Sequence, residues 1–236
     1  SRSFSKNDFL VSHLKELYSS VIFNDSGKTL QGDLLVEFLR PATKAIIGIE
    51  EISDSVLSQL PKLKVISKYG VGLDNLDLEM LKKRNIKLGF TPGVNKQSVA
   101  ELTLALILVG LKKIQGNNFD ILNGNWSQEK GSELFGKTIG LLGFGNIGQK
   151  LASLIQPFKC NILFFDEKDY SEKDIKAISE EYNLDIKLLD QTTLEIVLTK
   201  SDILSIHLPL ATETKNILSA GEFNQLKSNV CIINTA

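Results

Sequence analysis

The most informative segment of the chain is residues 138–148, which read TIGLLGFGNIG. Its first five residues form an apolar run typical of a buried strand, and three glycines follow with the spacing G-x-G-x-x-G. Gly143 permits a tight turn, Gly145 lets the backbone approach a pyrophosphate, and Gly148 lets a helix pack closely on the strand. A helical pattern continues over Gln149–Ile155. The segment therefore predicts a strand, a phosphate-binding turn and a helix.

A second apolar run with an acidic end supports a dinucleotide site. Ile162–Phe165 predicts a strand, and Asp166 follows at about twenty residues beyond the glycines. A carboxylate at this place accepts hydrogen bonds from the adenosine ribose and repels a 2′-phosphate. Glu167 adds a second negative charge, whereas Lys168 is a signal in the opposite direction. The pattern favours NAD over NADP, and the alternative is a flavodoxin-like turn that holds no cofactor.

Short apolar runs alternate with helical patterns along the rest of the chain. We expect further strands at Val21–Phe23, Ala45–Ile49, Leu63–Ser67, Ile86–Leu88, Ile203–Leu208 and Val230–Ile233, and helices at 7–18, 30–39, 54–60, 77–84 and 194–198. This alternation predicts an α/β fold with doubly wound parallel sheets, covered by helices on both faces. The turn Thr91-Pro92-Gly93 predicts a boundary between two domains, 1–92 and 93–236.

Composition narrows the class of protein. Of the 236 residues, 42% are hydrophobic and 23% are charged, which is the balance of a globular chain. The 27 basic residues nearly equal the 28 acidic ones, so nucleic acid has no electrostatic reason to bind. Two cysteines are too few for a disulfide scaffold and suit a reducing cytoplasm. The longest apolar run is too short to span a membrane, and no metal-ligand spacing occurs. We expect a cytoplasmic, globular protein.

One helical segment is apolar on nearly every side. Val99–Leu111 has no polar face, so a helix there must be buried all round. The same helix of a second subunit is the expected cover, which predicts a homodimer, and burial within one chain is the alternative. The segment that follows, residues 116–136, is polar and indicates turns around Trp126.

Candidate ligand contacts lie at the predicted strand ends. Ligands of parallel α/β sheets bind beyond the carboxyl ends of the strands. His207-Leu208-Pro209 and Asn234-Thr235-Ala236 fall at such ends, so we expect them beside the cofactor, with His207 a neighbour and no proton donor. In the first domain, Lys68 can hold a substrate carboxylate and Tyr69 can line the cleft; the alternative for Lys68 is a solvated surface position.

Eight stretches, in order, resemble the D-2-hydroxyacid dehydrogenase family, and within it the phosphoglycerate dehydrogenases. They are ISKYGVGLDN (66–75), TPG (91–93), VAELT (99–103), GKTIG (136–140), the glycine motif through Asp166, SDI (201–203), HLPL (207–210) and INTA (233–236). The resemblance implies a flavodoxin-like substrate domain, a Rossmann NAD-binding domain and hydride transfer between NAD and a D-2-hydroxy acid. The expected substrate is 3-phosphoglycerate, used in serine biosynthesis. Glyoxylate or hydroxypyruvate reductases and D-lactate dehydrogenases are the alternatives within the family, and an NAD-sensing corepressor is the alternative outside enzymes.

The resemblance also assigns site residues. It implies substrate binding by the glycine loop and its flanks, Lys68, Tyr69, Gly70, Val71 and Gly72. It implies cofactor binding by Val71, Gly143, Gly145, Asn146, Ile147, Gly148, Asp166, His207, Leu208, Pro209, Thr235 and Ala236.

Two departures from the family pattern affect these expectations. In the family an arginine follows Asn-Thr-Ala, and a glutamate and a histidine that act as the acid–base pair come later. This chain ends at Ala236 and its only arginines are Arg2, Arg40 and Arg84, so we expect a longer natural enzyme with its catalytic residues beyond Ala236. Glu50-Glu51 lies where several phosphoglycerate dehydrogenases carry an arginine for the substrate phosphate, which argues against that substrate.

Overall fold

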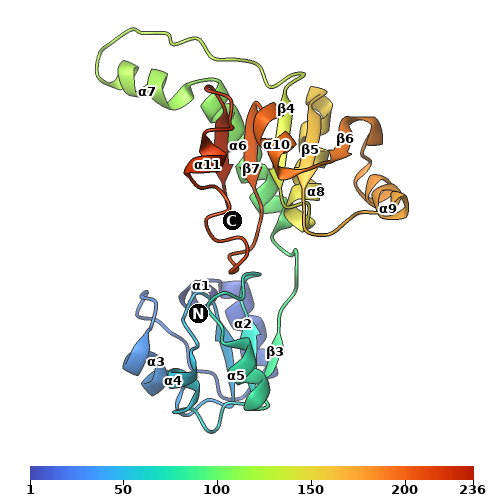
Figure 1. Ribbon diagram of the computed structural model, residues 1–236. Helices are drawn as coiled ribbons and strands as arrows, with labels where there is room; N and C mark the ends of the chain where they lie inside the picture. Colours follow the sequence, from blue (N-terminus) through green and yellow to red (C-terminus); the bar gives the residue numbers. More distant parts are fainter. The chain divides into compact units, whose positions relative to one another are not determined.

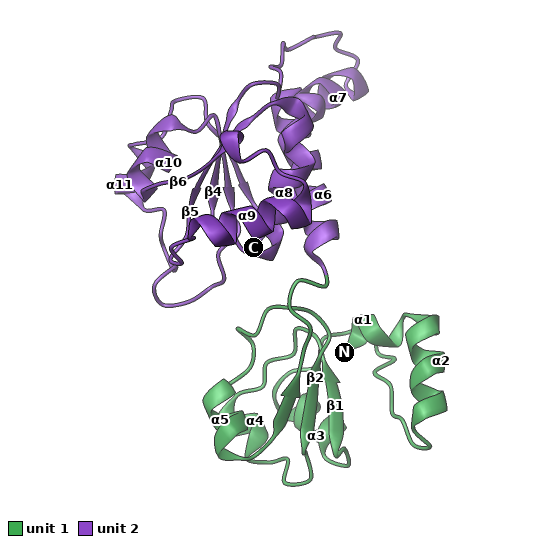
Figure 2. Ribbon diagram, turned by 90° about the vertical axis from the view of Figure 1, so that its right-hand side faces the viewer, with its two compact units in different colours: residues 1–94 green, residues 95–236 purple.

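Two separate parallel sheets organise the chain, one in each of two units. The computed structural model describes residues 1–236, which divide into unit 1, Ser1–Val94, and unit 2, Asn95–Ala236 (Figure 2). The division falls two residues after Pro92, the expected boundary. Each unit is described by itself.

Unit 2 has the strand order of a dinucleotide-binding fold. Its five parallel strands are β4 (Thr138–Leu142), β5 (Asn161–Phe165), β6 (Leu189–Gln191), β7 (Ile203–Ile206) and β8 (Cys231–Asn234). They lie in the order β6-β5-β4-β7-β8 (Figure 1). The sheet therefore starts in its middle and grows outward in both directions, which places a switch point of strand order beside β4.

Helices cover both faces of this sheet. Alternate strand residues point to opposite sides, and here both sets are apolar, so both faces must be buried. One face, with Ile139 and Leu141, packs against α6 (Lys96–Leu111) and α8 (Asn146–Ile155). The other, with Leu142 and Leu204, packs against α10 (Leu194–Lys200). The remaining elements are α7 (Ile114–Leu122), α9 (Glu172–Tyr182), α11 (Ala220–Phe223) and the 3₁₀ turns η1 (Gln156–Phe158) and η2 (Ile186–Leu188). The α/β prediction is confirmed.

Unit 1 contains a smaller parallel sheet in the order β1-β2-β3. Its strands are β1 (Lys44–Ile47), β2 (Val65–Lys68) and β3 (Lys87–Gly89), and its helices are α1 (Arg2–Ser5), α2 (Asp8–Leu17), α3 (Gly32–Leu39), α4 (Asp54–Leu57) and α5 (Leu78–Lys83). Apolar side chains from α3, α4, α5 and the strands, including Leu35, Leu57 and Ile66, form its core. Parallel strands joined by helices are again the expected arrangement.

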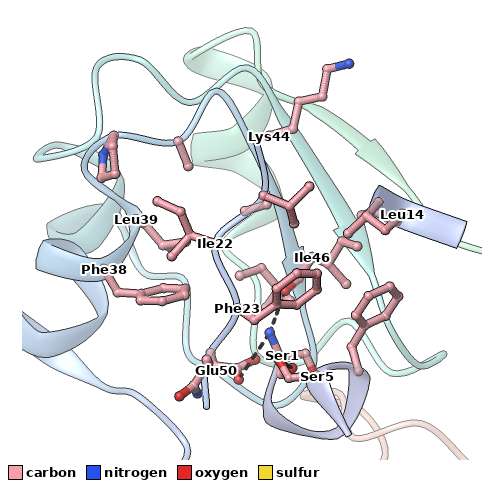
Figure 3. Close-up of a pocket in the computed structure, with 18 of the residues that line it drawn as sticks. Ser1, Ser5, Leu14, Ile22, Phe23, Phe38, Leu39, Lys44, Ile46 and Glu50 are labelled. Carbon is pink, nitrogen blue, oxygen red and sulfur yellow. Dashed lines mark hydrogen bonds and ion pairs between the residues drawn. The ribbon is translucent and has the colours of Figure 1, made fainter. Parts of the chain in front are cut away.

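The strand predicted at Val21–Phe23 is wrong. This segment makes no backbone hydrogen bond and is not part of the sheet. This segment and β1 both line a cavity of about 540 Å³, to which they contribute Ile22, Phe23, Lys44 and Ile46 (Figure 3). The apolar pattern favours a strand, but a strand forms only where a neighbouring backbone can pair with it.

Three smaller differences concern unit 2. The segment expected to contain only turns begins with α7, and the short strand β6 was not predicted. Helix α6 is buried on one face only, formed by Ala100, Thr103, Ile107 and Leu111. The other face of α6 is not covered by the rest of unit 2, so the expected burial on all sides is not met within residues 95–236. None of the helices combines the length and apolarity needed to cross a membrane.

Candidate functional site

The turn after β4 is shaped by two glycines that have no room for a side chain. Gly143 has φ +93°, and a Cβ there would lie 2.7 Å from the carbonyl oxygen of His207. A Cβ on Gly148 would lie 2.5 Å from the carbonyl oxygen of Gly143. Each obstacle is backbone, which cannot move aside as a flexible side chain can. These two glycines therefore fix the path of the turn against β7 and under the first turn of α8.

Gly145 differs, because no atom of the chain lies within 4 Å of where its Cβ would be. It is the N-cap of α8 and contributes no side-chain cap. The N–H groups of Asn146, Ile147 and Gly148 donate no hydrogen bond within the chain. The start of α8 thus combines free donors, the positive end of a helix dipole and open space, which together suit a phosphate group.

Aromatic packing holds this turn in place. Phe144 is fully buried, its ring stacks on Phe164 at 4.0 Å between centroids, and Tyr170 meets both rings edge-on. The carbonyl oxygen of Phe144 accepts hydrogen bonds from Tyr170 Oη at 2.9 Å and Gln149 Nε2 at 2.8 Å. Sequence reasoning missed Tyr170 and Gln149; an aromatic residue four positions after Asp166 was the available signal for the first.

Asp166 lies at the end of β5, next to the glycine turn. One of its oxygens accepts a hydrogen bond from the Phe144 N–H at 2.6 Å, and the other accepts one from the Lys168 N–H at 3.0 Å. Each carboxylate oxygen accepts more than one hydrogen bond, so both retain capacity for a ligand hydroxyl. The carboxylate is therefore oriented by the chain and still able to bind a ribose.

The ends of β7 and β8 reach the same edge of the sheet. His207 Nε2 lies 2.9 Å from Ser205 Oγ, while its Nδ1 is buried without a partner. Burial lowers the pKa of His207 to about 4, so its ring is neutral near pH 7. Next to it, Leu208 approaches Gly143, and just after β8 the Thr235 hydroxyl lies 3.0 Å from that of Thr103 on α6. A neutral His207 is consistent with a residue that lines the cofactor site and does not transfer a proton.

In unit 1 the loop after β2 is tied by a polar network. Lys68 Nζ donates to the Gly48 carbonyl oxygen at 2.6 Å and to the side-chain oxygen of Asn75. Asn75 Nδ2 donates to the carbonyl oxygens of Gly48 and Glu50. Burial is the main cause that lowers the pKa of Lys68. Sequence reasoning missed Asn75, since two of its partners, Gly48 and Glu50, lie more than twenty residues away.

Two N–H groups of this loop remain open to a ligand, and one of the two glutamates singled out in the sequence is buried. The N–H groups of Val71 and Gly72 donate no hydrogen bond within the chain. Glu50 is buried and accepts the Gly48 N–H at 2.6 Å, so it stabilises the 48–50 turn, whereas Glu51 is exposed. Of the acidic pair that argued against a phosphorylated substrate, only Glu51 faces solvent.

The structure brings most of the expected cofactor residues together. They are Gly143, Gly145–Gly148, Asp166, His207–Pro209, Thr235 and Ala236, which all lie at the carboxyl edge of the unit 2 sheet, after β4, β5, β7 and β8. Val71 is the exception, since it lies in unit 1 with Lys68, Tyr69, Gly70 and Gly72, at the carboxyl end of β2.

The strand order, the glycine turn and the placement of Asp166 define a Rossmann domain for a dinucleotide. Residues 104–236, more than half of the chain, match the family model described as D-isomer specific 2-hydroxyacid dehydrogenase, NAD binding domain. The chain belongs to the D-isomer specific 2-hydroxyacid dehydrogenase family and carries its NAD-binding domain.

Individual relatives agree with this assignment. The chain is 35% identical to a hydroxypyruvate reductase of Thermotoga maritima over 86% of the chain and 60% of the relative. It is 31% identical to a D-3-phosphoglycerate dehydrogenase of Methanocaldococcus jannaschii over 89% of the chain and 37% of the relative. The structure is similar to a D-lactate dehydrogenase from Aquifex aeolicus, solved with NAD and lactic acid, with a TM-score of 0.79 and 26% identity over 98% of this chain and 67% of the other. The chain spans less than two thirds of the length of these two curated relatives.

Proposed function

We propose that this chain is the cofactor-binding part and the substrate loop of an NAD-dependent dehydrogenase acting on a D-2-hydroxy acid. The observation that carries the proposal is the open start of α8. There, three N–H groups have no partner within the chain, the space at Gly145 is open, and the oriented carboxylate of Asp166 lies at the end of the next strand. The nicotinamide supplies the redox chemistry when it is bound.

Each part of the site has a separate task in this proposal. The first turn of α8 binds the pyrophosphate, and Asp166 orients the adenosine ribose. Leu208, Thr235 and Ala236 line the nicotinamide and exclude water. In unit 1 the N–H groups of Val71 and Gly72 bind the substrate carboxylate. A neutral His207 supports this arrangement, since a cation beside the oxidised nicotinamide would repel its positive charge.

Binding of NADH to the purified chain tests the cofactor half of the proposal without requiring turnover. We expect NADH to bind with saturable fluorescence enhancement, and Asp166→Ala to weaken binding about tenfold, which corresponds to the loss of charge-assisted hydrogen bonds to the ribose. Asp169→Ala, in the same loop, is the control. Equal binding by both variants would place the ribose elsewhere.

We propose 3-phosphoglycerate as the substrate, with hydroxypyruvate or glyoxylate as the second candidate. The relative from Methanocaldococcus jannaschii supports the first. The charges of unit 1 favour the second: Glu51 is exposed, Arg84 is paired with Asp54 at 2.8 Å, and two of the three Lys68 donors are bound within the chain. Turnover of NADH by the natural protein with phosphorylated and unphosphorylated 2-keto acids separates them, since a clear preference for the phosphorylated acid would exclude the second.

We also propose a homodimer through the open face of α6. Leu102 is 52% exposed and Leu106 is 38% exposed, and α7 adds the exposed Phe119 and Leu122. An apolar face of this kind is typical of a subunit interface. Leu106→Glu should convert a dimer to a monomer in light scattering, and Ile186→Glu, an exposed position on η2, should not. A wild-type monomer at micromolar concentration would contradict the proposal.

The alternative outside enzymes is an NAD-sensing corepressor. It shares the expected dinucleotide site, so NADH binding does not separate the two. Turnover does: binding of NADH without reduction of any 2-keto acid by the natural protein would favour the corepressor.

A further inference from the structure

We propose that Asp174 makes the dinucleotide site selective for NAD by binding the ammonium group of Lys168, which would otherwise hold the 2′-phosphate of NADP. This inference rests on the proposed dinucleotide site and adds a second selecting residue to Asp166. Residues 166–174, from the end of β5 through the first turn of α9, are called the ribose loop below.

Lys168 is the only cation between Asp166 and the start of α9. It lies two residues after Asp166, and its own N–H donates to an oxygen of that carboxylate at 3.0 Å. The backbone of Lys168 therefore lies beside the carboxylate expected to bind the adenosine ribose. A basic residue near this acid is the usual way in which dinucleotide folds accommodate a 2′-phosphate. From its position in the sequence alone, Lys168 would thus favour NADP.

The structure directs the head group of Lys168 to other partners. Its Nζ lies 3.1 Å from Asp174 Oδ1 and 4.5 Å from the centre of the Tyr170 ring. Tyr170 is itself fixed, because its hydroxyl donates to Phe144 and its N–H donates to the side chain of Gln191. The cation is therefore bound by a carboxylate and an aromatic face inside the ribose loop.

Hydrogen bonds orient the carboxylate of Asp174 and keep it charged. Its other oxygen accepts hydrogen bonds from the Ser171 N–H at 3.0 Å and the Ser171 hydroxyl at 2.6 Å, which completes the capping box of α9. The Ser171 hydrogen bonds, followed by Lys168, lower the pKa of Asp174 to about 2, so the carboxylate stays charged near pH 7. Its position at the start of a helix also stabilises its negative charge.

The pairing changes what a 2′-phosphate meets. An unpaired Lys168 would offset the repulsion from Asp166 and Glu167. With Lys168 bound to Asp174, the carboxylates of Asp166 and Glu167 are no longer offset by the ammonium group that lies nearest to them in the sequence. The 2′-hydroxyl of NAD, in contrast, needs only an acceptor, which Asp166 supplies. Selectivity against NADP thus depends on a residue eight positions away from the one that contacts the ribose.

Equilibrium binding of NADH and NADPH to single variants tests the inference. Asp174→Asn keeps the size and the capping oxygen but removes the charge, so Lys168 becomes available. We expect NADPH to bind about three- to tenfold more tightly, as for an exposed charge pair, and NADH affinity to change less than about twofold. Glu172→Gln is the matched control, because it removes a charge from the same first turn of α9 and Glu172 forms no ion pair. Its effect on NADPH should be less than about twofold.

Two variants of Lys168 complete the test. In the wild-type background Lys168→Met should leave NADPH affinity nearly unchanged, because the ammonium group is already bound. In Lys168→Met/Asp174→Asn the gain for NADPH should vanish. The inference is wrong if Asp174→Asn gains no more than Glu172→Gln, if the double variant keeps the gain, or if Lys168→Met alone weakens NADPH strongly. Absence of NADH binding to the wild type would instead refute the proposed dinucleotide site. Thermal melts of each variant identify any that fail to fold.

Discussion

The loop after β2 in unit 1 and the turn after β4 in unit 2 occupy equivalent places, since each follows a central or near-central parallel strand at its carboxyl end. They are held in different ways. The β4 turn is fixed by glycines packed against backbone and by the buried ring of Phe144. The β2 loop is fixed by half-buried polar groups, Lys68 and Asn75, which bind the turn at Gly48.

The comparison teaches that rigidity in the two places has different energetic origins. Where a glycine packs directly against backbone, the neighbouring atoms cannot move to make room for a side chain. A substitution there therefore lowers the stability of the fold. Hydrogen bonds exchanged for bonds to water contribute only about 1 kcal/mol each. Substitution of either packed glycine of the β4 turn, Gly143 or Gly148, should therefore have a larger effect than substitutions in the β2 loop.

The largest effect is expected at Gly143. Gly143→Ala places a Cβ against the His207 carbonyl at a φ that side chains rarely adopt, so the free energy of unfolding should fall by about 3 kcal/mol or more. Gly145→Ala is the matched control. Its φ is −76° and the space is open, so we expect a change below about 0.5 kcal/mol together with weaker NADH binding. Urea unfolding measures the first quantity, and equal destabilisation by both variants would contradict the contrast between the glycines.

An intermediate effect is expected at His207 and depends on pH. The folded chain keeps the ring neutral down to about pH 4, whereas the unfolded chain takes up a proton near pH 6.5. Unfolding therefore binds a proton between these values, and stability is lost as the pH falls from 6.5 towards 4, by about 2–3 kcal/mol.

Urea unfolding at pH 7 and pH 5 measures this loss. His207→Gln should reduce the difference between the two pH values. His13→Gln, at an exposed position on α2, is the control. An unchanged pH dependence in His207→Gln would show that the ring is not the group that titrates.

The smallest effect is expected in the β2 loop. Asn75→Ala removes the hydrogen bonds to Gly48, Glu50 and Lys68, and should lower the stability of unit 1 by about 1–2 kcal/mol. Asn118→Ala, at an exposed position on α7, should change stability by less than about 0.5 kcal/mol. A loss at Asn75 as large as at Gly143 would show that the polar network is as unyielding as the glycine packing.

The sequence predicted the residues that hold the β4 turn better than those that hold the β2 loop, and the different origins of rigidity explain why. The glycines of the turn act through backbone conformation, which leaves a fixed spacing in the sequence. Asn75 acts through partners far along the chain, and no local pattern reveals them. The strand β6 is only three residues long and contains Asp190 and Gln191, so it lacks the apolar run of a buried strand. Val21–Phe23 has that run without a neighbouring backbone to pair with.

The same distinction applies to the candidate site. Gly143, Gly145, Gly148 and Asp166 follow from the motif and its spacing, and the structure brings them to one edge of the sheet. Tyr170 and Gln149 support the turn from outside the motif, and their contacts become visible only when the chain is folded.

The buried ring of Phe144 has a consequence for the kinetics of association. Because stacking on Phe164 already immobilises the turn in the free protein, a ligand need not order it, and the entropy lost on binding falls mainly on the ligand itself. The dinucleotide then binds to a turn that already has its bound conformation. Its association should therefore follow a single kinetic phase, without a slow rearrangement of the polypeptide.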